Sequence, residues 1–546
     1  MVRRARAVPA GGVVLVPADR KGDGAEVNGM VPVVLVRGAM GNLAAKPVPS
    51  GPAARNNDSR DCEPDGVSVP MMEPTRCVCF RLAVLAIRLW PYLPPPVIHM
   101  LVRSTRAWLA VAVFTLSVNS LPAADWARFR GPNGTGVSPD TAHTPVKFSP
   151  TENLKWKTAL PGPGSSCPIV VGDKVFVTCW SGYGVDRGEP GSQSKLKRHM
   201  VCVDRSSGKI LWNTAVDAAL PEDQYRGMFA ENGYASHTPV SDGKNVYAFF
   251  GKSGAVAFDM TGKQLWQTKV GSESDRRGWG SSSSPVLYEN LVIVTASAES
   301  QALVGLDKET GKEVWRKEAQ GFGGTWGTPV LVKVDDTRTD LVLAVPYEIW
   351  GFDPATGKLR WFCEAMNTDS FCSSVTAEGN VVYAVEGMGG GSIAVRVGGM
   401  GDVTKTNVVW SGRHNSRIST PLFSDGRIYF INSGVANCLD AASGEKVYKE
   451  RLSGGGSAAP PAGGSERRGG GRRGGQNYSS PVAADGKLYY VSRGGDVSVV
   501  KLGAEFELLA TNRVTEDTED FSASPAISNG EIFLRSSKNL YCVGEK

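Results

Sequence analysis

A short pattern that recurs about every 45 residues constrains the fold of this chain more than any other feature. A Ser/Thr-Pro dipeptide, or a close variant of it, opens an apolar run at eight places. Five intervals between successive marks are 44 or 46 residues; the other two, of 71 and 60 residues, contain polar or glycine-rich insertions. A fixed period of this length indicates a repeat architecture. The marks are Cys167-Pro168, Thr238-Pro239, Ser284-Pro285, Thr328-Pro329, Ser374-Val375, Thr420-Pro421, Ser480-Pro481 and Ser524-Pro525.

Two hairpin signals follow the opening mark within many of the repeats. The first is an Asp-Gly turn, such as Asp242-Gly243, which leads into an alternating apolar run. The second is Asp-x-x-Thr/Ser-Gly-Lys-x-x-Trp with small variations, as in Asp204, Gly208 and Trp212. Asp-Gly between apolar runs is a strong hairpin signal, because such turns need positive φ. Each repeat therefore predicts four short antiparallel strands, which is the size of one propeller blade.

The ends of the chain predict how the ring closes. Eight marks imply eight blades, but the last repeat, residues 524–542, stops before its outermost strand. The missing strand stands ahead of the first repeat, in residues 154–158 around Trp156. We therefore predict an all-β fold over residues 125–546. It is an eight-bladed β-propeller of four-stranded antiparallel blades, and its last blade is closed by the N-terminal strand.

Residues 1–124 differ from the rest of the chain. The whole chain carries a net charge of +6, and this segment alone accounts for it, so the remainder is neutral and gives no electrostatic case for nucleic acid binding. After Met100 come basic Arg103 and Arg106, an apolar run over 108–118 and small residues at 122–124. This order is typical of a secretory signal peptide. It predicts export to the periplasm or beyond, without a stable membrane anchor.

A signal peptide belongs at a true N-terminus, so we interpret residues 1–99 as an extension that is either not translated or disordered. The alternative is a genuine extension in which residues 80–101 form a membrane segment. Arg81, Arg88 and the prolines at 94–96 count against that alternative.

Four further features carry less specific signals. The Gly- and Arg-rich insertion at 454–476 has too few apolar residues to order itself, so we expect a flexible loop. The acidic run at 515–520 is interpreted as a solvated loop, with a Ca²⁺ site as the alternative. Cys167 and Cys179 could pair across one hairpin or could serve as small apolar core residues. The serines at 281–284 lack the Gly-x-Ser-x-Gly surroundings of a nucleophile and indicate turn chemistry.

The repeat resembles the PQQ-type propeller repeat, whose family includes quinoprotein alcohol dehydrogenases and the BamB outer-membrane assembly factor. The segment Asp125-Trp126-Ala127-Arg128-Phe129-Arg130-Gly131-Pro132-Asn133-Gly134 resembles the W-x-x-F-R-G-P-x-G opening of secreted bacterial PQQ-like repeat proteins. The resemblance covers residues 125–546. It implies the propeller fold and leaves the function open, because propellers host unrelated activities.

Resemblance to the dehydrogenases would imply PQQ stacked on a tryptophan, a disulfide between adjacent cysteines, Ca²⁺ held by Glu and Asn, and an Asp base. This chain has no Cys-Cys dipeptide and no C-x-x-C-H haem motif. A matching set of Glu, Asn and Asp residues cannot be aligned. We therefore expect no cofactor, with PQQ and Ca²⁺ as the disfavoured alternative, and expect no metal and no catalytic residue.

A binding site, if there is one, should border the central funnel, where the loops lead into the innermost strands. Aromatic and polar residues just ahead of the opening marks suit a small planar ligand or a peptide, although packing is the favoured interpretation of the tryptophans and a loop position that of the histidine and the arginines. The two arginines ahead of Thr420 could clamp a carboxylate. The candidate ligand-binding residues are Glu231, Asn232, His237, Trp279, Trp326, Arg413, Arg417 and Tyr478.

The sequence leaves three functions open. The leading hypothesis, by resemblance to BamB, is an exported monomeric scaffold rather than an enzyme, one that binds envelope proteins or peptides. Its sheet edges could accept a partner strand. The second is a PQQ-dependent or other redox dehydrogenase. The third is a propeller that binds a carbohydrate or small metabolite at the funnel aromatics.

Overall fold

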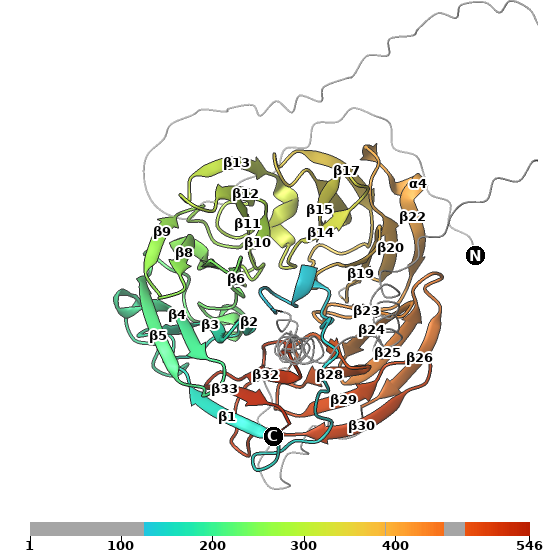
Figure 1. Ribbon diagram of the computed structural model, residues 1–546. Helices are drawn as coiled ribbons and strands as arrows, with labels where there is room; N and C mark the ends of the chain where they lie inside the picture. Colours follow the sequence, from blue (N-terminus) through green and yellow to red (C-terminus); the bar gives the residue numbers. More distant parts are fainter. Residues whose placement is uncertain (1–124, 388, 453–475, 546) are drawn as a thin grey trace, which may run out of the picture. The chain divides into compact units, whose positions relative to one another are not determined.

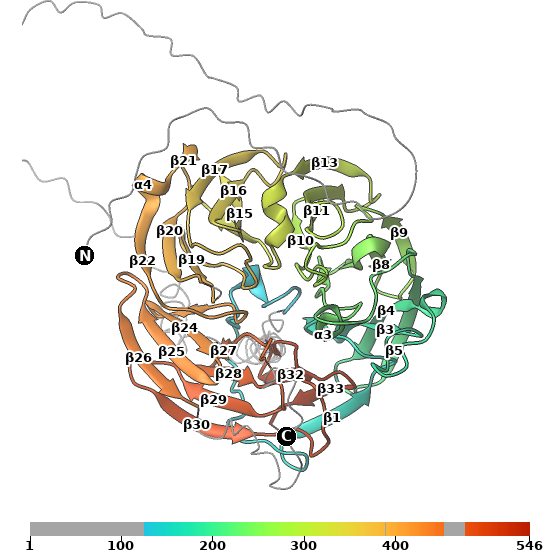
Figure 2. The same ribbon diagram turned by 180° about the vertical axis from the view of Figure 1, so that it is seen from behind.

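The computed structural model describes residues 125–387, 389–452 and 476–545. The proposed extension 1–99, the signal peptide at 100–124 and nearly all of the 454–476 insertion lie outside the described residues and stay predictions. Figures 1 and 2 show the described chain as a ring of blades around a central axis. It forms eight sheets, seven of four strands and one of five. The predicted eight-bladed, all-β propeller is confirmed.

The first four blades each run from an innermost to an outermost strand in chain order. Blade one contains β2 (Ile169–Val171), β3 (Lys174–Ser181), β4 (Lys197–Asp204) and β5 (Ile210–Asp217). Blade two contains β6 (Val240–Ser241), β7 (Asn245–Phe249), β8 (Ala255–Asp259) and β9 (Gln264–Thr268). Blade three contains β10 (Val286–Tyr288), β11 (Leu291–Ala296), β12 (Ala302–Asp307) and β13 (Glu313–Glu318). Blade four contains β14 (Val330–Lys333), β15 (Thr339–Val345), β16 (Glu348–Phe352) and β17 (Leu359–Glu364).

The remaining blades follow the same order, with two exceptions. Blade five contains β18 (Thr376–Glu378), β19 (Val381–Val385), β20 (Ser392–Arg396) and β22 (Val408–Gly412). The intervening β21 (Gly401–Asp402) joins blade four as its fifth strand. Blade six contains β23 (Leu422–Ser424), β24 (Arg427–Asn432), β25 (Val435–Asp440) and β26 (Lys446–Arg451). Blade seven contains β27 (Val482–Ala484), β28 (Lys487–Val491), β29 (Val497–Lys501) and β30 (Glu507–Asn512). Blade eight contains β31 (Ala526–Ser528), β32 (Glu531–Arg535), β33 (Asn539–Val543) and β1 (Leu154–Ala159).

Short helices occur only in connections of the described chain, and none has the length and apolarity that crossing a bilayer requires. They are η2 (Pro132–Gly134), η3 (Gln193–Lys195), α3 (Phe229–Asn232), η4 (Gly251–Ser253), η5 (Gln320–Gly324) and α4 (Thr404–Asn407).

The ring closes as predicted. Strand β1 pairs antiparallel with β33, and Trp156 lies opposite Cys542. The two ends of the propeller therefore share one sheet, and blade eight has no free outer strand position. Joining the ends in this way leaves no open blade face at either end of the repeat array.

The opening marks form a closed circle of hydrogen bonds around the central axis. The backbone N–H of each mark residue donates to the side chain of the mark residue in the next blade, and the eighth returns to the first. Because each hydroxyl accepts this bond, a serine or threonine is favoured ahead of each innermost strand. The eight bonds are Cys167 to Thr238 (2.9 Å), Thr238 to Ser284 (3.0 Å), Ser284 to Thr328 (3.0 Å), Thr328 to Ser374 (2.8 Å), Ser374 to Thr420 (3.0 Å), Thr420 to Ser480 (2.9 Å), Ser480 to Ser524 (2.8 Å) and Ser524 to the Cys167 sulfur (3.2 Å).

The tryptophan of the repeat joins neighbouring blades at the rim. Trp266 donates its indole N–H to the Lys308 carbonyl oxygen at 3.0 Å, and its ring covers Gly311 of the next blade. A Cβ on Gly311 would lie 2.5 Å from that ring, and the glycine has a φ of +70°. The Gly of one repeat is thus required both by its turn and by the Trp of the preceding repeat. Trp156 makes the same contact with Gly208, so the closing strand repeats the joint.

The apolar core is divided among the spaces between blades, because each sheet buries both faces against its neighbours. One cluster, for example, joins Val246 and Phe258 of blade two to Phe176 and Met200 of blade one. Cys167 and Cys179 are both buried and unpaired, so the core alternative holds and the disulfide alternative is wrong.

The segment that precedes β1 crosses one end of the central channel (Figure 1). Trp126, 1% exposed, pairs with Val170 of blade one, and Asn133 donates to the Leu331 carbonyl oxygen of blade four at 2.8 Å. Val137 pairs with Ala483 of blade seven. The W-x-x-F-R-G-P-x-G segment is therefore a strap that ties separate blades together. We call residues 125–137 the N-terminal strap.

The buried guanidinium of Arg130 holds the centre of this strap. It donates to the carbonyl oxygens of Pro481 at 2.8 Å, Pro421 at 2.9 Å and Thr135 at 3.1 Å. Burial lowers the pKa of Arg130 to about 9, so the side chain stays charged at neutral pH. Gly136 leaves room for it, because a Cβ there would lie 2.5 Å from the guanidinium.

Candidate functional site

The end of the channel opposite the strap, which we call the mouth, is bordered by two sets of loops. One set leads into the innermost strands. The other connects the second and third strands of each blade, because antiparallel strands return every second connection to the same end. The throat between them is a cavity of about 110 Å³ that the eight mark residues help to line. Phe129 of the strap, Cys372, Trp326 and Tyr478 also line it.

An aromatic pair stands beside the throat. The rings of Trp279 and Trp326 lie 4.9 Å apart, and the Arg277 guanidinium lies 5.8 Å and 5.9 Å from the two ring centroids. Arg277 also forms an ion pair with Asp369 at 2.9 Å. Trp326 is 7% exposed and donates its indole N–H to the Gly280 carbonyl oxygen at 2.7 Å. The faces that could stack on a planar ligand are therefore occupied largely by each other and by Arg277.

A chain of charges crosses the other side of the mouth. The Glu231 carboxylate forms ion pairs with Nη2 of Arg187 and Nη2 of Arg493, each at 2.7 Å. Burial alone would raise the pKa of Glu231, but hydrogen bonds from the two arginines outweigh burial and lower it. Arg493 also pairs with Asp520 and lies 5.5 Å from the Tyr478 ring. These contacts join the loop between blades one and two to blades seven and eight.

A larger cavity of about 1000 Å³ lies beside blades six to eight. Its lining combines apolar surface with many polar residues, among them Asn415, Asn432, Asn477 and Arg417. The Nε of Arg417 is buried and has no hydrogen-bond partner among the described residues. A cavity of this size and polarity could accommodate a ligand rich in hydroxyl or carboxylate groups.

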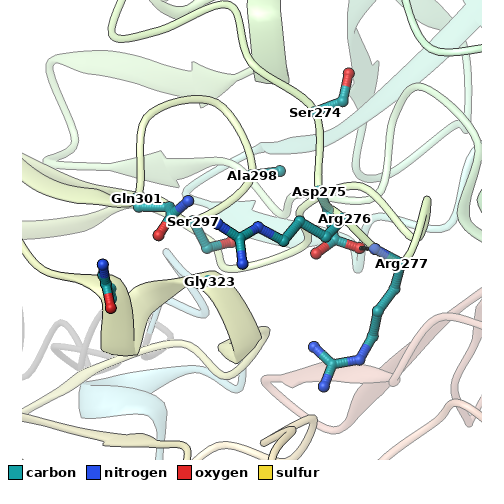
Figure 3. A pocket seen from close by; sticks show the side chains of 9 residues that line it. Ser274, Asp275, Arg276, Arg277, Ser297, Ala298, Gln301 and Gly323 are labelled. Carbon is teal, nitrogen blue, oxygen red and sulfur yellow. Dashed lines mark hydrogen bonds between the residues drawn. The ribbon is translucent and has the colours of Figure 1, made fainter. Parts of the chain in front are cut away.

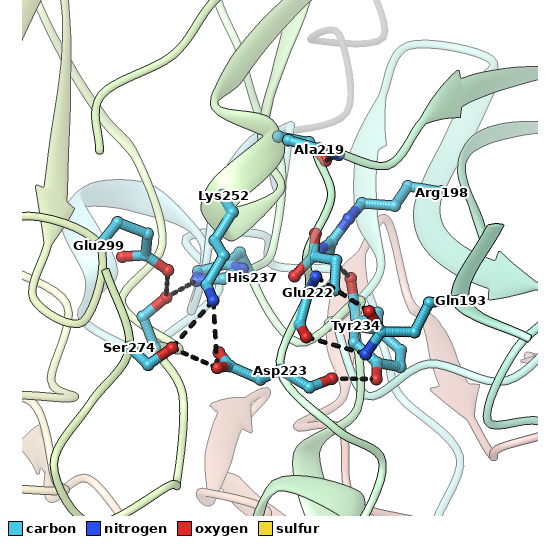
Figure 4. Close-up of polar contacts among 12 residues, drawn as sticks. Gln193, Arg198, Ala219, Glu222, Asp223, Tyr234, His237, Lys252, Ser274 and Glu299 are labelled. Carbon is cyan, nitrogen blue, oxygen red and sulfur yellow. Dashed lines mark hydrogen bonds and ion pairs between the residues drawn. The ribbon is translucent and has the colours of Figure 1, made fainter. Parts of the chain in front are cut away.

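A buried polar network lies beside the mouth between blades one, two and three (Figure 4). Arg198 forms an ion pair with Glu222, and both side chains are at most 3% exposed. Lys252 donates to Asp223 at 3.1 Å and to Ser274 at 2.9 Å. These pairs fix the long connection from blade one to blade two against its neighbours, because buried charges must be paired.

His237, Ser281 and Glu299 form the inner end of the same network. The Ser281 hydroxyl donates to Glu299 Oε1 at 2.5 Å, and His237 Nε2 lies 3.1 Å from the same hydroxyl oxygen. Since the only hydroxyl hydrogen is given to the carboxylate, His237 is the donor in its bond to Ser281. Ser281 is 7% exposed. In this geometry the Ser281 hydroxyl gives its hydrogen to Glu299 and not to His237.

Glu299 makes the stability of the fold depend on pH. Burial raises its pKa from 4.5 to about 7, against the opposing hydrogen bond from Ser281. A carboxyl with a raised pKa in the folded state contributes stability that is full below about pH 4.5 and is lost as the pH rises through 7. The shift corresponds to about 3 kcal/mol. We expect the free energy of unfolding of wild type, relative to Glu299→Gln, to fall by roughly that amount between pH 4.5 and 8.5 in denaturant titrations.

His237 acts in the opposite direction, because burial lowers its pKa to about 3 and its contribution to stability is lost as the pH falls below 6.5. Because both proteins contain His237, its contribution cancels in the difference in free energy of unfolding between wild type and Glu299→Gln. Exposed Glu273→Gln serves as the control for removing a carboxylate from the same part of the surface. A flat difference for Glu299→Gln would contradict the assignment.

The acidic run near the C-terminus is a structural element, and its interpretation as a solvated loop is wrong for Glu519. The Glu519 carboxylate is 2% exposed and accepts hydrogen bonds from Asn539 Nδ2 at 2.6 Å and the Tyr541 hydroxyl at 2.8 Å. Asp517 pairs with Lys157 at 2.9 Å. The carboxylates point to different partners, and the described residues contain no group of three His, Cys, Asp or Glu that could hold a metal ion.

The structure separates the candidate residues that the sequence grouped at the funnel. Asn232, Trp326 and Tyr478 line the throat, Trp279 packs on Trp326, and Arg417 lines the large cavity. Glu231 belongs to the charge chain. His237 is buried in the network, and Arg413 is exposed away from these cavities. Ligand binding by any of them stays a prediction.

Sequence reasoning missed three arginines of the mouth. Arg187 and Arg493 lie in connections between the second and third strands of blades one and seven, whereas the sequence prediction concerned only the loops ahead of the innermost strands. Counting both sets of loops at one end of the ring would have found them. Arg277 lies two residues ahead of Trp279, and its position over both tryptophans is visible only in the folded chain.

The residues at the mouth do not fit the cofactor set that resemblance to quinoprotein dehydrogenases implies. Cys372 has no neighbouring cysteine in the sequence, and it is unpaired. Glu231 is held by two arginines instead of facing an open coordination position. Glu386 accepts the backbone N–H groups of Cys372 and Gly387, each at 2.8 Å. A quinone stacked on Trp326 would have to displace Trp279 or Arg277.

Comparison with protein families supports the repeat assignment. A family model described as outer membrane protein assembly factor BamB matches residues 192–299 and 251–502. Two curated proteins named polyvinylalcohol dehydrogenase are similar over shorter stretches. The protein from Sphingopyxis sp. (strain 113P3) is 24% identical over 42% of this chain and 38% of its own length. The protein from Pseudomonas sp. is 23% identical over 41% and 37%. The chain thus spans less than two fifths of the length of these relatives.

Two solved dehydrogenase structures share the fold. A europium-containing methanol dehydrogenase is 11% identical and covers 78% of this chain and 98% of its own, with a TM-score of 0.53. The quinohemoprotein alcohol dehydrogenase of Comamonas testosteroni is 12% identical and covers 79% and 82%, with a TM-score of 0.50. BamB from Moraxella catarrhalis is 12% identical and covers 71% and 99%, with a TM-score of 0.48. At these identities the likeness concerns the fold alone.

Proposed function

Since the chain belongs to the BamB-type family of PQQ-like repeat propellers, we propose that it is a binding protein of the cell envelope that holds extended segments of partner proteins on the outer edges of its blades. The observation that carries this proposal is the fifth strand of blade four. Strand β21 pairs in parallel with the outermost strand β17, placing Trp361 opposite Gly401 and Phe362 opposite Asp402. An outer edge of this propeller thus accepts an added strand.

Other outer strands offer the same edge with apolar side chains beside it. Strands β5, β9 and β13 are the last strands of their sheets and pair on one side only. Unpaired backbone groups along an edge strand are a template for a further strand. The exposed apolar residues on the outermost strands are Ile210 (41%), Leu211 (48%), Leu265 (42%), Val314 (54%) and Val409 (39%).

The mouth supports binding rather than catalysis. Its arginines and carboxylates pair largely with one another, as in the chain from Arg187 through Glu231 to Arg493. Groups committed to such pairs are poorly placed to transfer a proton or ligate a metal, and they stiffen the loops that carry them. By the same reasoning we propose that no quinone is needed for the function.

The proposal is tested by photo-crosslinking at the blade edge. A photoreactive benzoylphenylalanine in place of Leu211 on β5 is expected to give adducts with envelope proteins when cells that produce the full chain are irradiated. The control is the same residue in place of Val185, which is 56% exposed but lies in a connection rather than on an edge strand. Mass spectrometry of the adducts should identify extended segments of the partners. Equal adducts at the two positions, or none at Leu211, would refute edge binding.

A second candidate function is a quinone-dependent dehydrogenase, which similarity to the two polyvinylalcohol dehydrogenases favours. Adding PQQ and Ca²⁺ to the purified full chain and recording the absorption spectrum separates the two functions. Under our proposal the PQQ spectrum stays that of the free quinone. A saturable spectral change at one equivalent would favour the dehydrogenase.

We further propose that the protein acts as a monomer in the periplasm or outside the cell, exported by the segment at 100–124. N-terminal sequencing of protein recovered from the envelope should begin near Asp125. A sequence that begins within residues 1–99 would overturn the export assignment.

A further inference from the structure

A cavity of about 480 Å³ lies outside the throat, between blades three and four (Figure 3). Three connections form it: the loop at 274–277 that leads into blade three, the turn at 297–301 between β11 and β12, and the short helix η5 that leads into blade four. A cavity of this size can hold a ligand of a few amino-acid residues.

The cavity is lined by an arginine that has no charged partner among the described residues. Arg276 is exposed, extends across the cavity in Figure 3 and has no hydrogen bond or ion pair with any described residue. Its neighbour Arg277 is instead paired with Asp369 at 2.9 Å. The nearby Asp275 carboxylate accepts the backbone N–H groups of Arg277 at 3.0 Å and Trp279 at 3.1 Å, which commits it to the loop.

Neutral polar groups face the same space. Ser297 is only 5% exposed, and its hydroxyl makes no hydrogen bond within the described chain. The side-chain amides of Gln301 and Gln320 likewise find no partner among the described residues. Gly323 leaves room for the first of them, because a Cβ there would lie 3.3 Å from the Gln301 amide oxygen. Together these groups offer a guanidinium, a hydroxyl and two amides, each with unused hydrogen-bonding capacity.

We propose that this cavity binds the C-terminal carboxylate of a peptide segment. The planar guanidinium of Arg276 matches a carboxylate with two parallel hydrogen bonds. The glutamine amides offer acceptors as well as donors, which suits the peptide group next to a chain end; a phosphate would leave those acceptors unused. This inference rests on the proposed function, because it gives the chemistry of one kind of partner segment.

The test uses fluorescein-labelled hexapeptides of mixed sequence, lacking Asp and Glu, in two forms: one with a free C-terminal carboxylate and one with a C-terminal amide. Fluorescence polarisation with the full chain should show binding of the carboxylate form that is roughly tenfold or more tighter, the effect of a hydrogen bond to a charged group. Arg276→Gln should abolish the difference, and Gln320→Ala should weaken binding of the carboxylate form a few-fold. Exposed Arg226→Gln, whose side chain also lacks a partner but lies outside this cavity, should change nothing.

Equal binding of the two peptide forms, or an unchanged difference in Arg276→Gln, would overturn the inference. Amidated peptides that contain an internal Asp form a third arm. If they bind as tightly as the free carboxylate form, the ligand is a side-chain carboxylate and the chain-end assignment is wrong. Crosslinking at Leu211 does not involve this cavity, so failure of the inference and failure of edge binding are observed separately.

Discussion

Replacing Arg130 with methionine is expected to lower the free energy of unfolding by about 3–5 kcal/mol, because its three nearest carbonyl acceptors, two of them buried, lose their charged donor and each unsatisfied buried group costs roughly 1–3 kcal/mol. Those carbonyls belong to Pro421 of blade six, Pro481 of blade seven and Thr135 of the strap itself. Relief of the desolvation of the guanidinium offsets part of the loss. Denaturant unfolding monitored by tryptophan fluorescence measures the change.

Arg128→Met provides the matched control for Arg130→Met. Arg128 lies in the same strap but makes a single hydrogen bond, to the Pro329 carbonyl oxygen at 3.2 Å. Its replacement should therefore cost clearly less. Equal losses for the two variants would mean that the strap is held by its apolar contacts and that the central guanidinium has no special part in it.

Replacing Trp156 with alanine is expected to cost about 3–5 kcal/mol as a large-to-small substitution of a buried aromatic residue. It should also release the N-terminal segment. Trp156 is 9% exposed, donates to the Arg205 carbonyl oxygen at 2.8 Å and covers Gly208. Strand β1 belongs to blade eight only through noncovalent contacts, since its neighbour β33 comes from the other end of the chain, and Trp156 fastens it in addition to blade one. Limited proteolysis should therefore cut Trp156→Ala between residues 125 and 160.

Trp266→Ala removes the equivalent contact in blade two, where β9 follows β8 directly along the chain. It should lower stability to a similar degree without exposing residues 125–160 to protease. If residues 125–160 resist protease equally in Trp156→Ala and Trp266→Ala, the joint between the chain ends does not depend on Trp156. The pairing of β1 with β33 would then hold the ring closed.

Several features of the fold could be predicted because they are written into local patterns. A serine or threonine ahead of seven of the eight innermost strands, a glycine in a turn and, in many repeats, a tryptophan four residues later recur at a fixed period, and the period alone counts the blades. The position of Trp156 also predicted closure, since a repeat that lacks its last strand must obtain it from elsewhere. The period could not reveal that the marks of neighbouring blades are hydrogen-bonded to one another. The hydroxyl of Thr238, for example, accepts the backbone N–H of Cys167, 71 residues away.

The candidate site was predicted less well. Trp279 and Trp326 could be placed near the mouth because both precede an opening mark, but their contact with each other and with Arg277 depends on how three blades meet. His237 has the same kind of position in the sequence and yet is buried with Ser281 and Glu299. Equivalent positions in a repeat share a backbone, whereas side-chain direction and burial depend on the insertions that differ between blades.

The sequence by itself determined the number of blades, the four strands common to them and the joint between the chain ends, because each rests on short-range patterns that repeat; the fifth strand β21 was visible only in the structure. Only the tertiary structure decided which charges are neutralised. Arg276 and Arg277 are adjacent and chemically identical, yet one meets Asp369 of a distant loop and the other faces an open cavity. That difference comes from contacts between residues far apart in the chain, which no local pattern encodes.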